Sequence, residues 1–518
     1  MKPSSDTDVG PAWPRLWCWA GGAVFVIVAL ASAAGYRYGS SDQAFHVPAV
    51  IHALDPEAFP RDGVLLDAQA RLMLTDEVIA AVVRGTGLPI ASVFFAVTVV
   101  SLWLFWLGLV RVGLAAYGDR WLTAALTAAA TLRHRIPETS ANSFEPYYNP
   151  RMLAFALGVI AMGAVQRRQP WLAIGLVALG ALVHVTTALW FAVFLGVAIV
   201  VLQPAFRRLA VPVAGLAVCA AAGMVILGPL QSSLTRMDDL WLQAIASKDS
   251  LFPQVWPAWA WAANLGLLPL AWALHRWRLR RGLASRDETA FLWGGAALVS
   301  LFVVTLPLVG ARMALPTQLQ ISRVFWILDL LATVQLVGAL GALPRRPVVA
   351  AVVAVLAMAR AGYVMAIEHP ERPLVAVRLP EDEWHEAMRF LAEQPRSAHV
   401  LADPGHAWKY GTSVRVASGH DVVLEEVKDA ALAIYDRDVA RRVLTRMRDL
   451  DDFASLDAER ARDLGARYDA DFLVTDTDLP LPLAHRNRRF RVYRLERDST
   501  PPVVPAAGSP GPGADTPE

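Results

Sequence analysis

The residues most suited to chemistry in this sequence stand where its first hydrophobic segment ends. Residues 16–34 are almost all apolar, and residues 36–46 then read YRYGSSDQAFH, which places Asp42 just beyond the exit of the segment. A carboxylate held at the rim of an intramembrane cavity is partly desolvated and can accept a proton. Asp42 is therefore the candidate general base, although the same residue could instead cap a helix that starts at Gln43.

Three further groups could bind a ligand on the same side of a membrane. Arg323 stands at the start of a hydrophobic segment, where its guanidinium could bind a ligand or simply extend to lipid head groups. His184, at the tip of a predicted helical hairpin, could bind a ligand or be structural. Tyr147, Tyr148 and Arg151, in the motif EPYYNPR, could pack on a sugar or lipid head group, or form an interfacial aromatic belt.

The composition is that of a polytopic membrane protein. The 518 residues are 55% hydrophobic and 18% charged, with a mean hydropathy of +0.39, so one soluble core cannot hide the apolar surface. The net charge of +2, with cations in short clusters between apolar segments, argues against nucleic-acid binding. Cys18 and Cys219 both fall in hydrophobic segments, and no stretch of the sequence has the spacing of metal ligands. We therefore expect no divalent metal, and the sequence identifies no cofactor.

The elements that must position these residues are membrane helices, and the fold class is mostly α. Segments of roughly 17 to 25 apolar residues can cross a bilayer, and the chain has about eleven candidates. They cover residues 16–35, 89–115, 121–132, 151–165, 171–183, 186–202, 209–230, 259–274, 291–308, 324–343 and 348–367. Arginine clusters in alternate turns place those turns and residues 1–15 in the cytoplasm by the positive-inside rule. Arg133 and Arg135 fall on the outer side in this arrangement, contrary to the rule.

The first outer loop, residues 36–88, is predicted to contain short helices that lie on the membrane interface. Its acidic residues are predicted to be solvated, or to close the loop back on the membrane: Asp55, Glu57, Asp62 and Asp67. Asp329 lies within a hydrophobic segment, where a charge is costly, so we expect it to face the protein interior as a hydrogen-bond partner.

A soluble, extracytoplasmic α/β domain is predicted at residues 368–497, after the hydrophobic module of residues 16–367. Apolar periodicity and turn residues predict helices at 384–391, 438–450 and 456–468 and strands at 398–402, 471–475 and 490–495. No glycine-rich phosphate loop follows a strand, so nucleotide binding is not expected. Residues 498–518 are rich in Pro, Gly, Ala and Ser and are predicted to be a disordered tail.

The motif SDQAFH at residues 41–46, followed by ALDP at 53–56, resembles the opening motif of the GT-C superfamily of membrane glycosyltransferases. That motif has two adjacent acids, then a Tyr or His, and then an Ala-x-x-Leu helix. Residues 151–157 and 181–188 look like the middle helices of the superfamily. The predicted architecture is also similar to that of the superfamily: a first span, a long outer loop, many further spans and a C-terminal outer domain. The chain is closest to uncharacterised bacterial members.

The resemblance implies an enzyme of the bacterial inner membrane that moves a sugar from a polyprenyl-phosphate donor to an extracytoplasmic glycan, lipid or protein acceptor, with inversion. Asp42 falls on the first acid and would be the general base, whereas Gln43 stands where the superfamily usually has a second acid. The expected substrate-binding residues are Arg323, His184, Tyr147, Tyr148, Arg151, Gln43, His46 and Asp55. A membrane protein that binds lipid-linked glycans without catalysis, or scaffolds an envelope complex, is the main alternative. A secondary transporter would predict internal repeats, which the sequence does not show.

Overall fold

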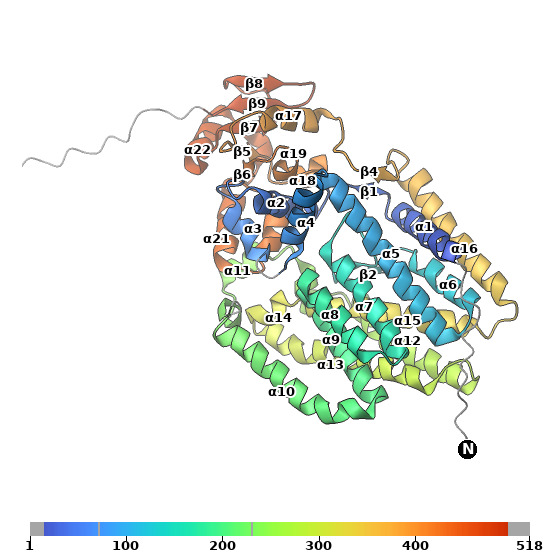
Figure 1. The fold of residues 1–518 in the computed structure, drawn as a ribbon. Helices are drawn as coiled ribbons and strands as arrows, with labels where there is room; N and C mark the ends of the chain where they lie inside the picture. The colour runs from blue at the N-terminus through green and yellow to red at the C-terminus, as the bar shows by residue number, and fades with distance from the viewer. Residues whose placement is uncertain (1–14, 71–72, 229–230, 496–518) are drawn as a thin grey trace, which may run out of the picture.

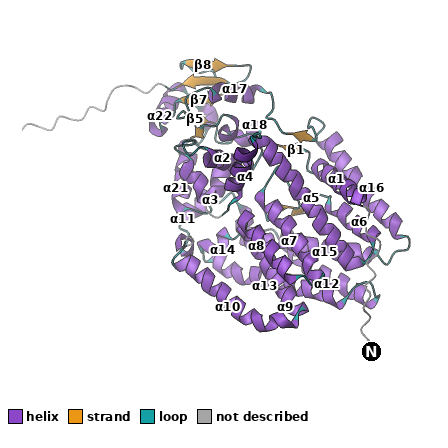
Figure 2. Ribbon diagram, in the orientation of Figure 1, coloured by secondary structure: helices purple, strands orange, loops and turns teal. Residues whose placement is uncertain are grey.

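A computed structural model describes residues 15–70, 73–228 and 231–495 of the chain. The predictions for residues 1–14 and for the tail at 498–518 therefore lie outside the described residues. Figure 2 shows that helices make up most of the molecule and that the largest sheet is confined to one end. The fold class is mostly α with a C-terminal region around a mixed sheet, as predicted.

Each hydrophobic segment identified in the sequence contains a helix. In chain order these are α1 (Arg15–Ser32), α5 (Ile90–Tyr117), α6 (Arg120–Ala130), α7 (Pro150–Gln166), α8 (Pro170–Val183), α9 (Val185–Leu202), α10 (Pro204–Ile226), α12 (Ala258–Arg280), α13 (Thr289–Gly310), α15 (Val324–Leu340) and α16 (Arg346–Tyr363). Two short helices precede α12 and α15, namely α11 (Asp239–Ala244) and α14 (Ala314–Gln318). Apolar periodicity thus predicted helix correctly, because no Gly or Pro cluster interrupts these segments.

The prediction of about eleven membrane spans is wrong. Within the described parts of the chain, five helical stretches are long and apolar enough to cross a bilayer: Ile90–Tyr117, Val185–Leu202, Arg286–Gly310, Ala314–Leu340 and Arg346–Glu368. They indicate a multi-pass membrane protein. Trp19–Ser32, Pro150–Gln166 and Pro170–Val183 are apolar but shorter.

Helix α7 shows why apolar character alone overestimates the number of membrane spans. It has 17 residues and is buried along almost its whole length between neighbouring helices, so its apolar side chains serve the protein core. A Cβ on Gly158 would lie 2.3 Å from the ring of Phe191 on α9, which means that only glycine allows this close approach. The same hydrophobic pattern can therefore describe either a helix in lipid or a helix buried in protein.

The end of α12 carries a buried arginine that the sequence had placed in a cytoplasmic turn. The Arg278 guanidinium donates to Glu288 Oε2 at 2.7 Å and to Gln335 Oε1 on α15 at 2.6 Å, and the side chain is fully buried. A Cβ on Gly338 would lie 2.5 Å from Arg278 Cζ. Gly338 therefore leaves the space that this ion pair needs.

We expect Gly338→Ala to lower the stability of the protein by about 1–3 kcal/mol, because the added methyl group would displace a buried, paired arginine. The matched control is Gly362→Ala on α16, where nothing lies within 4 Å of the added carbon. The control should leave stability unchanged or raise it by up to about 1 kcal/mol. Thermal melting in detergent compares the two, and equal melting temperatures would contradict the role assigned to Gly338.

The first outer loop folds into α2 (Gln43–Leu54), α3 (Gly63–Ala70) and α4 (Thr75–Thr86), which confirms the predicted short helices. Figure 1 shows these helices beside the C-terminal region, at the end of the bundle where the sheet lies. A two-residue strand β1 (Tyr36–Arg37) at the exit of α1 pairs in parallel with β4 (Val375–Ala376), which follows α16. The hairpin β2 (Arg135–Ile136) and β3 (Ala141–Asn142) closes the next loop on that side.

The C-terminal region contains one five-stranded mixed sheet. Its strands are β5 (His399–Ala402), β6 (Asp421–Val422), β7 (Phe472–Thr475), β8 (Leu483–Arg486) and β9 (Arg491–Arg494), in the order β6-β5-β7-β9-β8. The first three run parallel and the last three antiparallel. The helices are α17 (Glu383–Ala392), α18 (His406–Tyr410), α19 (Val414–Ala417), α20 (Glu426–Leu432), α21 (Arg437–Asp449) and α22 (Ala458–Tyr468). The predicted strands and long helices are confirmed, whereas β6 and β8 were missed because neither has a long apolar or alternating pattern.

Candidate functional site

Asp42 lies at the meeting point of the first outer loop, α7 and the C-terminal region. Its carboxylate accepts hydrogen bonds from Lys428 Nζ on α20 at 2.6 Å and from Asn149 Nδ2 at 2.9 Å. Arg151 Nη2, in the first turn of α7, is 3.8 Å away. Asp42 occupies the position before α2, but its side chain makes no capping hydrogen bond. The carboxylate is therefore held by charged and polar side chains from elsewhere in the chain, and the helix-capping alternative is not supported.

A polar cavity of about 550 Å³ opens in front of this carboxylate. Several of the residues predicted from the sequence line it together: Asp42, His46, Tyr147, Arg151, His184 and Arg323. They come from segments separated by as much as 281 positions, from Asp42 to Arg323, and the fold brings them to one place. The cavity is large enough for a sugar with a phosphate group, since ligand pockets commonly measure a few hundred Å³ or more.

The other predicted binding residues lie outside this cavity. Tyr148 packs against Phe94, with ring centroids 5.7 Å apart, and lines a separate small pocket. Gln43 is fully buried, where its Oε1 accepts a hydrogen bond from the Gly39 amide at 2.7 Å. Asp55 ends α2 and forms an ion pair with Arg396 of the C-terminal region. Tyr148, Gln43 and Asp55 thus contact other residues of the chain outside this cavity.

Sequence reasoning missed several residues that complete the site. Lys428 is 386 positions from Asp42, so no local pattern could link the two. Glu145 accepts hydrogen bonds from Arg151 Nη2 at 2.8 Å and from Arg133 Nη2 at 3.2 Å, and it thereby holds both arginines at the cavity wall. The signal that could have found them was the violation of the positive-inside rule at residue 133. Arg133 lines the cavity and pairs with Glu145, so its charge has a partner there.

The charges around Asp42 decide its protonation. Burial opposes ionisation of the carboxyl, but the Lys428 ammonium and the Arg151 guanidinium outweigh it and hold the pKa of Asp42 well below its usual value. Burial lowers the pKa of the neighbouring His46 imidazole to about 4, despite the attraction of Asp42. At neutral pH the cavity therefore contains an ionised carboxylate beside a neutral imidazole.

The structure also resolves the prediction for Asp329. Asp329 on α15 is hydrogen-bonded to His134, with its Oδ2 2.7 Å from Nδ1, which confirms the predicted role as a structural partner. Among the residues that the structure describes, no group of three or more His, Cys, Asp or Glu side chains is placed to hold a metal ion.

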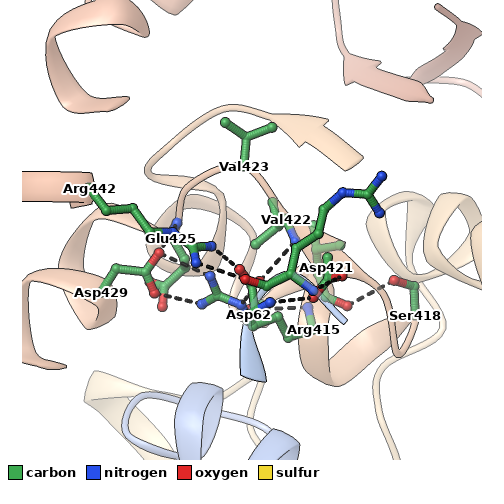
Figure 3. Close-up of polar contacts among 12 residues, drawn as sticks. Asp62, Arg415, Ser418, Asp421, Val422, Val423, Glu425, Asp429 and Arg442 are labelled. Atoms are coloured by element: carbon green, nitrogen blue, oxygen red, sulfur yellow. Dashed lines mark hydrogen bonds and ion pairs between the residues drawn. The ribbon is translucent and has the colours of Figure 1, made fainter. Parts of the chain in front are cut away.

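The acidic residues of the first outer loop are not simply solvated, as Asp62 shows. It is completely buried and bonded to Arg415 of α19, with 2.7 Å between Oδ2 and Nε, and it is also paired with Arg442. Arg415 binds Asp429 through both terminal nitrogens, at 2.6 and 3.0 Å. Figure 3 shows these carboxylates around the Arg415 guanidinium. The loop is held on the C-terminal region, because this buried arginine supplies the charge that Asp62 needs.

Glu425 at the edge of this cluster should make stability depend on pH. Its side chain is buried, one carboxyl oxygen has no hydrogen-bond partner, and burial raises its pKa to about 8. The folded protein therefore binds a proton that the unfolded chain releases near pH 4.5. Stability should fall as pH rises through the window between these values, because folding there requires proton uptake.

We expect Glu425→Gln to reduce this pH dependence, because the amide is neutral throughout. Melting temperatures of the wild type and the variant, measured between pH 5 and pH 9, should diverge as pH rises. Glu459→Gln, an exposed position on α22, is the control and should leave the wild-type profile unchanged. Parallel curves for Glu425→Gln and the wild type would show that Glu425 is ionised in the folded protein.

No protein-family model matches this sequence, and no curated protein is significantly similar to it. The functional argument therefore depends on the residues of the cavity and their chemistry.

Proposed function

We propose that this protein is a membrane glycosyltransferase that moves a sugar from a polyprenyl-phosphate donor to an acceptor hydroxyl, as the GT-C resemblance implies. The observation that carries the proposal is the convergence of an ionised carboxylate with several arginines on one polar cavity. A phosphate leaving group needs cations close to its developing charge, and a hydroxyl nucleophile needs a base.

The base and the leaving phosphate would act on opposite faces of the sugar. The Asp42 carboxylate takes the proton of the acceptor hydroxyl while that oxygen attacks the anomeric carbon of the sugar. The bond between this carbon and the phosphate oxygen breaks on the opposite face, and the electron pair leaves with the lipid phosphate. The cations Arg151 and Arg323 are suited to receive that phosphate, since guanidinium groups pair with phosphate oxygens in two-point contacts.

The pairing of Asp42 with Lys428 sets a condition on this mechanism. A carboxylate in a tight ion pair is a weak base, because the ammonium stabilises its ionised form. A bound phosphate would compete for Lys428 and Arg151 and so restore the basicity of Asp42. Binding of the donor would in this way prepare the base for the acceptor.

We infer a bacterial inner membrane location, with the cavity and the C-terminal region on the extracytoplasmic side and the N-terminus inside. The support is the distribution of arginines. Ion pairs from Arg168 to Asp287 and from Arg346 to Asp119 connect the turns of the bundle that carry arginine clusters. These turns lie at the end of the bundle away from the C-terminal sheet (Figure 1). The positive-inside rule then assigns that end to the cytoplasm.

A transfer assay with the full-length protein in proteoliposomes tests the proposal. The protein is given a panel of polyprenyl-phosphate sugars and extracts that contain glycan, lipid and protein acceptors. Transfer of one labelled sugar, with release of polyprenyl phosphate, is the expected result. Substrate transport across the membrane without covalent transfer would contradict it.

The ion pair between Asp42 and Lys428 also favours a second function, binding of a lipid-linked glycan without turnover. A scaffold of this kind would keep the cationic cavity and need no base. Gln43, in place of a second acid, fits this alternative as well. Tight binding of a polyprenyl phosphate, with no transfer for any donor of the panel, distinguishes this function from the enzyme.

A further inference from the structure

A second group of cations lines the cavity apart from Arg151 and Arg323. Its members come from the exit of α1, from the segment that leads into the β2–β3 hairpin and from the chain after α16: Arg37, Arg133, Arg135 and Arg372. β1 and β4 tie the first and last of these segments together. Four arginines from three distant parts of the chain thus line one cavity.

The carboxylates nearby do not balance this group. Arg133 shares Glu145 with Arg151, and Arg372 pairs with Glu371, which is largely exposed. Arg37 and Arg135 form no ion pair with any described residue. The Nε atoms of Arg37 and Arg133 are buried without a hydrogen-bond partner. Buried donors of this kind cost free energy unless a ligand accepts from them.

The two groups adjoin at Glu145, which pairs with both Arg133 and Arg151. Burial, together with repulsion from Arg372 and Arg133, lowers the pKa of Arg37. The main cationic neighbour of Arg323 is Arg151, which faces Asp42. Arg37, Arg135 and Arg372 therefore add positive charge to the cavity that forms no ion pair with Asp42 among the described residues.

We propose that Arg37, Arg133, Arg135 and Arg372 form a second anion subsite that binds a phosphate group of the other substrate. This inference rests on the proposed function, because it assigns the second subsite to the acceptor. The acceptor of the reaction would then itself carry a phosphate, either on a lipid head group or on a soluble molecule. Its hydroxyl would face Asp42 while its phosphate is held across the cavity.

The test counts bound phosphate groups and requires no sugar transfer. The full-length protein is placed in nanodiscs of phosphatidylcholine, and binding of inorganic phosphate is measured by equilibrium dialysis. In a second arm the nanodiscs contain a small fraction of phosphatidic acid, and bound lipid is counted by native mass spectrometry. Wild type should bind two phosphate groups, from either source.

The variant Arg37→Gln/Arg372→Gln should lose one bound phosphate group, with affinity at that site at least about tenfold weaker. Arg323→Gln should lose the other. The control Arg441→Gln/Arg486→Gln removes the same charge from exposed positions of the C-terminal region and should bind as wild type. A loss confined to the phosphatidic acid arm identifies a lipid head group, and a loss confined to the inorganic phosphate arm identifies a soluble phosphate.

Unchanged stoichiometry and affinity of Arg37→Gln/Arg372→Gln in both arms would overturn the proposal. If that variant does not fold, Arg135→Gln, which alters an exposed side chain at the rim, provides the same comparison. The count of bound phosphate groups does not depend on turnover. Loss of one phosphate group in Arg37→Gln/Arg372→Gln would therefore support the subsite even if no sugar is transferred. The absence of transfer for every donor of the panel would separately reject the enzyme.

Discussion

The substitution Asp42→Asn is expected to lower the rate of sugar transfer by roughly 10²- to 10⁴-fold while the protein stays folded. The amide has almost the same shape as the carboxylate and can still accept from Lys428 Nζ, but it cannot take a proton from the acceptor. Initial rates with the donor identified from the panel, at saturating acceptor, measure the effect. Binding of polyprenyl phosphate should be retained or become tighter, since Arg151 and Arg323 remain and Lys428 no longer faces a competing carboxylate.

Asp55→Asn is the matched control for this experiment. Asp55 stands at the other end of α2, and its carboxylate pairs with Arg396 outside the cavity. We expect this variant to transfer sugar at the wild-type rate. Full activity of Asp42→Asn would reject Asp42 as the base, and His46, the neutral imidazole on the same cavity wall, would be the next group to replace.

Replacing Arg415 by methionine is expected to destabilise the folded protein by about 3–5 kcal/mol. Arg415 is completely buried between Asp62 and Asp429, and its removal would leave Asp429 without its buried counter-charge and Asp62 with Arg442 alone. Thermal melting measures the loss of stability. Because Asp62 belongs to the first outer loop, hydrogen exchange of residues 55–62 should also become faster.

The control is Arg441→Met on α21, where the arginine is exposed and pairs only with Asp438 in the same helix. It should change stability by less than about 0.5 kcal/mol. A small effect of Arg415→Met, with unchanged exchange in the loop, would mean that the buried cluster does not hold the loop on the C-terminal region.

The helices could be predicted from sequence because local periodicity determines them. α17 and α22 appear at the predicted places since their apolar residues recur on one face. The number of spans could not be predicted in this way. α7 and α8 are as apolar as a span but too short, and whether such a helix contacts lipid or protein depends on its neighbours.

The candidate site was predictable only in part. Asp42, Arg151 and Arg323 could be proposed because each residue type stands near the end of a hydrophobic segment, where charge is costly without a purpose. Lys428 could not, since a lysine on a soluble helix resembles any exposed cation. Asp62 was predicted to be solvated or to close the loop back on the membrane, because the neighbouring sequence does not reveal its partner. That partner, the buried Arg415, lies 353 positions away.

The sequence by itself determined a mostly helical membrane protein with an α/β C-terminal region, because composition and periodicity act over short distances. Only the tertiary structure decided which charges meet. It turned a loop aspartate into the counter-ion of a lysine on α20, and it brought four arginines from three segments to one cavity. The physical reason is that the energy of a charge depends on its partners and its burial, and both are set by contacts between residues far apart in the chain.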